Sequence, residues 1–209
     1  MSIRDTYKQY GWKFFPRLIK SGLRRFGIQH EVFYLLEWNV NAEELNRKME
    51  GYDFSDIQEL TIADFQSSDS FSEQKKNLFQ ARLKSKEYSC YGIKLGDEIV
   101  YSTWISWNMM GYPSYFNKTD KLQQNEALLE DSFCHPTQRG KGLHSKMNLF
   151  RMQLISERGR SAVLALVLKE NTPALNVQLK SGFRIVKEIR FFKVGNLRKI
   201  KEIVVNGNL

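Results

Sequence analysis

Cysteine, histidine and long apolar runs are scarce in this chain of 209 residues. The two cysteines, Cys90 and Cys134, are too few for a disulfide framework, and they lack metal-ligand spacing with the three scattered histidines. No stretch reaches the roughly 18 apolar residues that span a bilayer, and the N-terminus lacks the apolar core of a secretory signal. We therefore expect a reduced, cytoplasmic protein without a metal site.

Carboxylates are outnumbered by cations, with 23 Asp and Glu against 32 Lys and Arg, which gives a net charge of +9. This excess favours polyanionic partners, namely phosphorylated cofactors, nucleotide-linked substrates, nucleic acid or an anionic membrane surface. Because the basic residues are spread along the chain without a recognition motif, we expect no nucleic-acid partner.

Residues 1–28 alternate aromatic and basic side chains. After Pro16 the apolar residues recur at helical spacing until Gly27, which predicts an amphipathic basic helix. Such a helix could contact an anionic membrane surface, although an apolar stripe of this kind more often packs on its own domain.

The remaining pattern divides the chain into an N-terminal appendage, residues 1–52, and a main domain, residues 53–209. Apolar periodicity and turn residues predict strands at 32–38, 57–62, 88–95, 98–107, 127–134, 162–168, 183–194 and 200–205, and helices at 42–49, from about 63 to 83, from 144 to 157 and from 173 to 181. Residues 108–125 are expected to form a long loop rich in aromatic residues.

The glycine-rich run Arg139-Gly140-Lys141-Gly142 lies between the strand 127–134 and the helix that begins near His144. Glycines let the backbone approach a ligand closely, so N–H groups at the helix start can converge on a phosphate. Arg139 and Lys141 add side-chain charge. The run predicts an anion site, although a plain surface turn uses the same residue types.

The segment after the helix completes a strand-helix-strand unit. Ala162–Leu168 is continuously apolar, as in a strand buried on both faces, and it should lie parallel to the strand 127–134. Thr172 is expected to cap the next helix, with Pro173 at its first position and Gly182 at its end. The fold class is therefore α/β with a mixed sheet.

Two motifs in this order resemble the GNAT superfamily of N-acetyltransferases, whose pattern is a strand, Arg/Gln-x-x-Gly-x-Gly/Ala, a helix, a strand, then Asn several residues before Gly-Phe. The first motif is Arg139 to His144, and the second runs from Asn171 to Gly182-Phe183. The resemblance covers residues 57–195. It implies a mixed, mostly antiparallel sheet with a splayed parallel strand pair, flanked by helices.

The resemblance also implies acetyl-CoA, or another acyl-CoA, as the cofactor. It assigns Phe133, Cys134 and Asn171 to the pantetheine arm, with Phe133 and Cys134 also polarising the thioester carbonyl. It assigns the pyrophosphate to the backbone of Arg139, Gly140, Lys141, Gly142, Leu143 and His144. Two positions depart from the pattern. His144 stands where Gly or Ala is usual, and Gln178 stands where many members have the tyrosine that protonates the CoA thiolate, a task glutamine cannot perform.

Glu130 is the first candidate for the general base that removes a proton from the acceptor amine, and Asp131 is the second. Strand alternation places Glu130 and Cys134 on one face and Asp131 on the other, and a buried carboxylate can have a raised pKa. A structural ion pair is the alternative. Cys134 lacks an activating base for covalent catalysis.

These features predict an enzyme that transfers an acetyl group from acetyl-CoA to a primary amine by direct attack. A small phosphate-bearing amine, such as a nucleotide-linked amino sugar, suits the basic surface. The alternatives are a protein, peptide or polyamine acceptor, or a non-catalytic acyl-CoA-binding or membrane-associated module.

Overall fold

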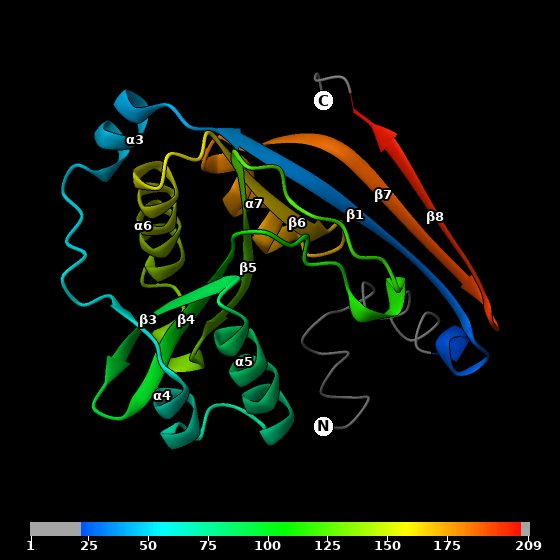
Figure 1. Cartoon of the computed structure of the whole chain (residues 1–209), viewed down its shortest axis with the longest axis horizontal. Coiled ribbons are helices and arrows are strands. Elements are labelled where there is room, and N and C mark those ends of the chain that lie inside the picture. The colour runs from blue at the N-terminus through cyan, green and yellow to red at the C-terminus, as the bar shows by residue number, and fades with distance from the viewer. Residues whose placement is uncertain (1–21, 206–209) are drawn as a thin grey trace.

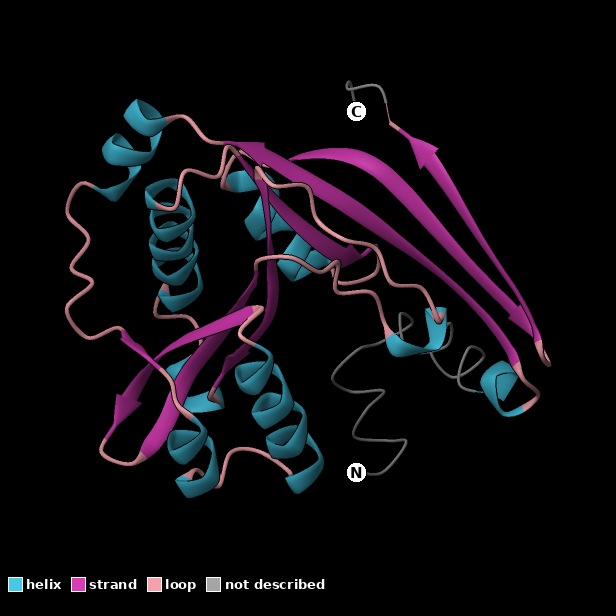
Figure 2. Ribbon diagram, in the orientation of Figure 1, coloured by secondary structure: helices cyan, strands magenta, loops and turns pink. Residues whose placement is uncertain are grey.

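The strands form one mixed sheet in the order β2-β3-β4-β5-β6-β1-β7-β8 in the computed structural model, which describes residues 22–205 (Figures 1 and 2). The strands are β1 (Ile28–Asn39), β2 (Gln58–Glu59), β3 (Tyr88–Leu95), β4 (Glu98–Ser106), β5 (Glu126–Cys134), β6 (Ala162–Leu168), β7 (Arg184–Val194) and β8 (Leu197–Val204). Among these strands only β5 and β6 pair in parallel, and every other neighbouring pair is antiparallel.

Several helices begin at a short polar residue whose side chain accepts a hydrogen bond from an N–H group of the first turn. The helices are α3 (Ala42–Met49), α4 (Ile62–Ser67), α5 (Glu73–Ser85), α6 (Leu143–Glu157) and α7 (Thr172–Lys180), with 3-10 turns η2 (Ser114–Phe116) and η3 (Pro136–Gln138). Asn41 caps α3, and Ser72 caps α5. Thr61 and Asp64 form a reciprocal capping box at α4.

Most predicted elements are confirmed, including the β3–β4 hairpin and the parallel β5–β6 pair. Three details were wrong. The helix expected from about 63 to 83 is two helices, α4 and α5, because Ser68 is the C-cap of the first and Ser72 is the N-cap of the second. The strand expected at residues 57–62 is reduced to Gln58–Glu59, because the Thr61 capping box starts α4 directly afterwards. The cap of α7 is Asn171 rather than Thr172, since the Asn171 side chain accepts from the N–H of Ala174.

The strand expected at residues 32–38 lies within β1, which occupies the sheet position between β6 and β7. It is hydrogen-bonded on both sides: Leu35 lies opposite Leu166 of β6 and opposite Lys187 of β7. Residues 28–39 of the predicted appendage are therefore a component of the central sheet.

The apolar side chains form three clusters on the two faces of the sheet. One face packs against α3, α6 and α7 through residues such as Leu36, Met147 and Leu175. The other face packs against α4 and α5 around Trp104 at one end of the sheet, and at the other end against the loop that contains Phe116. None of the helices within residues 22–205 combines the length and the hydropathy required to cross a bilayer.

Leu36 tests whether β1 unfolds together with the rest of the sheet. Its side chain is 0% exposed, so Leu36→Ala should lower the free energy of unfolding by about 3 kcal/mol. Leu95→Ala, at an exposed hairpin end, is the control and should change it by less than about 0.5 kcal/mol. Urea unfolding followed by tryptophan fluorescence and by circular dichroism measures both. Two separate transitions, only one of them shifted by Leu36→Ala, would contradict a shared cooperative unit.

Candidate active site

The parallel strands β5 and β6 separate after four paired residues. Their ladder runs from Glu126, opposite Ala162, to Leu129, opposite Ala165. Beyond this point β5 pairs only with β4, and β6 pairs only with β1. The divergence opens a cleft of about 360 Å³ between the two strands, as the family resemblance implied.

Six of the predicted site residues line this cleft. They are Glu130, Asp131, Phe133, Cys134, His144 and Asn171. The other five lie beside the cleft in sequence. The turn before α6 consists of Arg139, Gly140, Lys141 and Gly142, and the first residue of α6 is Leu143. Residues from β5, α6 and α7 are thus brought together at the point where the sheet divides.

The turn before α6 leaves the start of the helix accessible. Gly140 and Gly142 have φ of +79° and +76°, a left-handed backbone conformation that favours glycine, and a Cβ at either would meet nothing within 4 Å. Gly142 is the N-cap and supplies no side-chain hydrogen bond, so no side chain caps the first N–H groups of α6. The Lys141 ammonium group donates a hydrogen bond to Gln138 Oε1 at 2.8 Å. The geometry fits an anion such as a pyrophosphate.

His144 does not crowd the helix start, because its imidazole points into the cleft. Nδ1 lies 2.6 Å from the hydroxyl of Tyr101 on β4, and Nε2 is buried without a partner. Burial, and then the nearby Arg151 cation, lower the pKa of His144 from 6.5 to about 4. The ring is therefore neutral at physiological pH.

A β-bulge changes the direction of the side chains on β5. The β4–β5 register shifts between Ser102 and Trp104, and Asp131 has φ of +34°. The predicted alternation is therefore wrong. Glu130 and Asp131 both reach Arg82 of α5, whereas Cys134 packs in the cluster on the α6 side of the sheet.

Glu130 presents one bound and one unbound carboxylate oxygen. Oε2 accepts from Arg82 Nη2 at 2.8 Å, and Oε1 is buried without a hydrogen-bond partner. The side chain is 8% exposed. Burial raises the pKa of Glu130, Arg82 opposes this rise, and Asp131 adds to it. Such a carboxylate can accept a proton at its free oxygen.

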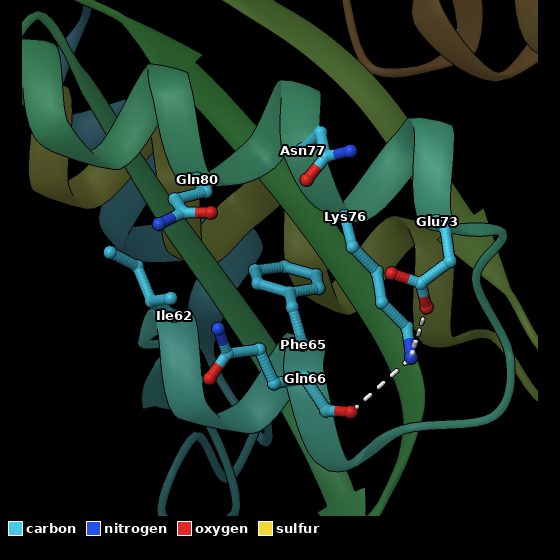
Figure 3. Close-up of a pocket in the computed structure, with 7 residues that line it drawn as sticks. All are labelled: Ile62, Phe65, Gln66, Glu73, Lys76, Asn77 and Gln80. Carbon is cyan, nitrogen blue, oxygen red and sulfur yellow. Dashed lines mark hydrogen bonds and ion pairs between the residues drawn. The ribbon is translucent and has the colours of Figure 1, made fainter.

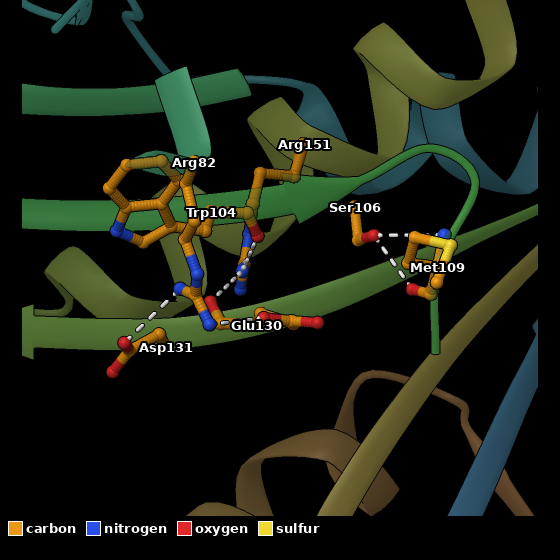
Figure 4. A network of polar contacts seen from close by, with 7 residues as sticks. All are labelled: Arg82, Trp104, Ser106, Met109, Glu130, Asp131 and Arg151. Atoms are coloured by element: carbon orange, nitrogen blue, oxygen red, sulfur yellow. Dashed lines mark hydrogen bonds and ion pairs between the residues drawn. The ribbon is translucent and has the colours of Figure 1, made fainter. Parts of the chain in front are cut away.

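Arg82 is held in place by two aromatic rings. Its guanidinium lies 5.2 Å from the ring centroid of Tyr88 and 5.3 Å from that of Trp104. From this position it donates to Glu130 and, at 3.3 Å, to Asp131 (Figure 4). The arrangement fixes both carboxylates at the bulge.

Arg151 of α6 is a site residue that the sequence analysis missed. It is fully buried, and Nη1 donates to the backbone oxygens of Trp104 at 3.2 Å and Glu130 at 3.4 Å (Figure 4). Burial lowers its pKa to about 10, so it stays cationic at neutral pH. The available signal was a cation four residues after Met147, on the apolar face of the helix.

Gln178 is also buried, and it belongs to the same network. Its Oε1 accepts from Asn148 Nδ2 at 3.3 Å, and Asn148 accepts in turn from Arg151. The amide that replaces the expected tyrosine therefore helps to hold Arg151 beneath the cleft.

A smaller hollow of about 90 Å³ lies between α4 and α5 (Figure 3). Its one cation, Lys76, is 3.3 Å from Glu73 and donates to the backbone oxygen of Gln66 at 3.2 Å. This hollow lacks the convergent, unpaired polar groups found in the main cleft. In residues 22–205, no three His, Cys, Asp or Glu side chains come close enough to hold a metal ion.

Comparison with known proteins identifies the fold. No family model matches the chain, and no curated protein sequence matches it. Solved structures do match. A GNAT-family acetyltransferase from Colwellia psychrerythraea has a TM-score of 0.53 at 13% identity, over 88% of this chain and 74% of that one. A protein assigned to the GNAT acetyltransferases from Novosphingobium aromaticivorans has a TM-score of 0.53 at 12% identity, over 80% of this chain and 65% of that one.

The chain therefore has the fold of the GNAT acetyltransferases, which confirms the resemblance and the predicted fold class. A Drosophila protein also matches, with a TM-score of 0.52 at 14% identity over 88% of this chain. The chain spans 58% of the length of that protein and 65% of the length of the Novosphingobium protein. At these identities the likeness concerns the fold.

Gly111, in the loop between β4 and β5, lies directly against the carboxylate of Glu130. A Cβ at this position would be 1.8 Å from Oε1, so Gly111→Ala should lower the free energy of unfolding by about 1–3 kcal/mol. The loss should largely disappear in a Glu130→Ala background, where the carboxylate is absent. Denaturant unfolding of the four proteins measures this coupling. Equal losses in both backgrounds would mean that the loop does not press on Glu130.

Proposed function

We propose that the chain is an N-acyltransferase that moves an acetyl group from acetyl-CoA to a primary amine. The observation that carries this proposal is the cleft between the diverging strands β5 and β6, which has the uncapped start of α6 beside it and, in its lining, a buried carboxylate with one oxygen that lacks a hydrogen-bond partner. When bound, acetyl-CoA would supply an activated thioester.

Several groups of the chain would bind the cofactor. The backbone N–H groups at residues 139–144 would meet the pyrophosphate, assisted by the positive end of the α6 dipole. Phe133 and Cys134 lie on the part of β5 that no longer pairs with β6, so their backbone would be available to the pantetheine arm. Asn171, the N-cap of α7, follows β6 in the chain and lines the side of the cleft opposite β5.

Glu130 would take a proton from the acceptor amine at Oε1, the oxygen without a partner. Its raised pKa makes Glu130 a stronger base than a fully exposed glutamate would be. Asp131 is the second candidate. It also binds Arg82, but its side chain is more exposed and lies at the bulge.

Gln178 has no acidic proton, so another group must protonate the leaving sulfur. Tyr101 contributes a hydroxyl to the cleft lining. If His144 carries its proton on Nδ1, it donates to the Tyr101 oxygen and avoids a buried, unpaired Nε2–H. The Tyr101 hydroxyl proton would then be available for transfer, from a hydroxyl whose pKa is raised by burial.

A small phosphate-bearing amine remains the acceptor that we propose, and the support for it is the basic residues Arg139 and Lys141 in the turn beside the cleft. Nucleotide-linked amino sugars are the first compounds to test. Thiol release from acetyl-CoA, followed over a panel that also includes polyamines and peptides, measures transfer directly. CoA binding without turnover on any amine would favour a binding module instead.

Calorimetric titration should detect binding of acetyl-CoA and CoA in the micromolar range. Gly142→Val should weaken this binding at least tenfold, because a β-branched residue disfavours the left-handed conformation at the start of α6. Gly51→Val is the matched control, since Gly51 has φ of +81° and open space outside the cleft. It should lose similar stability while keeping its affinity. Equal affinity in both variants would remove the turn from the cofactor site.

Glu130→Gln should lower kcat by about 100-fold or more while leaving CoA affinity nearly unchanged. In the wild type, kcat/KM should fall as pH drops through the raised pKa of Glu130, because the base must be ionised. Arg82→Gln removes a cation that lowers this pKa, so the fall should move to higher pH. Asp131→Asn should move it to lower pH. A larger loss of kcat in Asp131→Asn than in Glu130→Gln would make Asp131 the base.

A further inference from the structure

The end of the β1–β7–β8 ribbon, which we call the ribbon tip, comprises residues 22–30 and 192–201. Two segments far apart in sequence meet there: the N–H of Gly195 donates to the oxygen of Gly27 at 3.0 Å, and Ile28 lies opposite Val194. In Figure 1 the tip projects at the far right, away from α3 and α6. It lies outside the cleft lining.

Large apolar side chains are exposed at the ribbon tip. Phe26 is 81% exposed and Leu197 is 79% exposed, the two highest values for large apolar residues in the part of the chain that is described. The others at the tip are Leu23, Phe192 and Val194. Half of the exposed large apolar residues within 22–205 are thus concentrated in these two short segments. Such a concentration commonly marks an interaction surface.

Positive charge is concentrated in the same place. The tip holds Arg24, Arg25, Lys193, Arg198, Lys199 and Lys201, without any Asp or Glu. It therefore carries +6 of the chain's net +9. Arg24 pairs with Glu31, just outside the tip, whereas the other five cations form no ion pair with the described residues. Their charge is available to an anionic partner.

The shape of the tip decides which anionic partner fits. Phe26 and Leu197 are highly exposed at the end of the ribbon, whereas a peptide helix docks its apolar face in a hydrophobic groove. A lipid surface accepts projecting apolar side chains between its headgroups, and its anionic lipids attract flanking Lys and Arg. Nucleic acid would use the cations but would give no role to Phe26 and Leu197.

We propose that the ribbon tip binds anionic membrane surfaces, with Phe26 and Leu197 entering the interface and the flanking cations contacting lipid phosphates. Lys193 also lines a hollow of about 250 Å³ with Arg24, Gly27, Gln29 and Tyr115, beside which a headgroup phosphate would fit. Because the tip lies outside the cleft, this proposal does not depend on acyl transfer.

Co-sedimentation of the full chain with vesicles tests the proposal. The chain should bind vesicles that contain about 30 mol% phosphatidylglycerol, should bind pure phosphatidylcholine at least tenfold more weakly, and should dissociate as salt is raised towards about 0.5 M. Absence of binding to the anionic vesicles would overturn it.

Paired variants separate the apolar and the charged contributions. Phe26→Ser with Leu197→Ser, and separately Arg198→Glu with Lys199→Glu, should each weaken binding to anionic vesicles at least tenfold. The matched controls are Leu95→Ser, at the exposed β3–β4 hairpin end, and Lys75→Glu with Lys84→Glu on α5. Both controls should bind like the wild type. If the tip variants also bind like the wild type, the membrane contact lies elsewhere in the chain.

A fluorescent label tests insertion directly. An environment-sensitive dye attached through Leu197→Cys, in a Cys134→Ser background, should shift to the blue when anionic vesicles are added. The same dye attached through Leu95→Cys should not shift. Filter binding with single-stranded and duplex oligonucleotides completes the test. Affinity for nucleic acid that is lost with the charge reversals but kept with the serine variants, together with no dye shift, would replace the membrane with nucleic acid as the partner.

Discussion

The separation of β5 from β6 is the constraint on which the rest of the site depends. A sheet that opens in its middle leaves backbone groups without their ladder partners, and buried unpaired groups cost free energy. Where β4 and β5 change register beside this opening, Arg151 donates to the backbone oxygens of Trp104 and Glu130. This requires a fully buried cation, which is costly unless it is well hydrogen-bonded. Asn148 and Gln178 continue the network that holds it.

The charges are arranged in opposite ways at the two regions we have described. At the cleft, the cations have partners within the protein: Arg82 donates to two carboxylates, and Arg151 donates to backbone oxygens. At the ribbon tip, five cations remain unpaired among the described residues and lie beside exposed apolar side chains. The net charge of +9 alone therefore does not distinguish these two environments. The buried cations position chemistry, and the exposed ones are available to a partner.

Local sequence signals predicted most of the fold, because caps, glycines and apolar periodicity act over a few residues. Gly142, Gly182 and the run Ala162–Leu168 are examples. Six of the predicted site residues line the cleft. Non-local features were not predictable in this way. The bulge at Asp131 reversed the expected side-chain directions on β5, and the contact of Gly111 with Glu130 joins a loop to a strand that follows it. Alternation assumes an unbroken ladder, which this strand lacks.

The position of β1 also governs the order in which the chain can assemble. Both of its partners, β6 and β7, lie more than a hundred residues later in the sequence. During synthesis β1 therefore leaves the ribosome long before either edge that it must join, and it has to wait as an unpaired apolar strand. Completion of the sheet is deferred to the last segments made. A piece of the chain that began after residue 52 would lack a central strand and would expose two open edges, which favours aggregation.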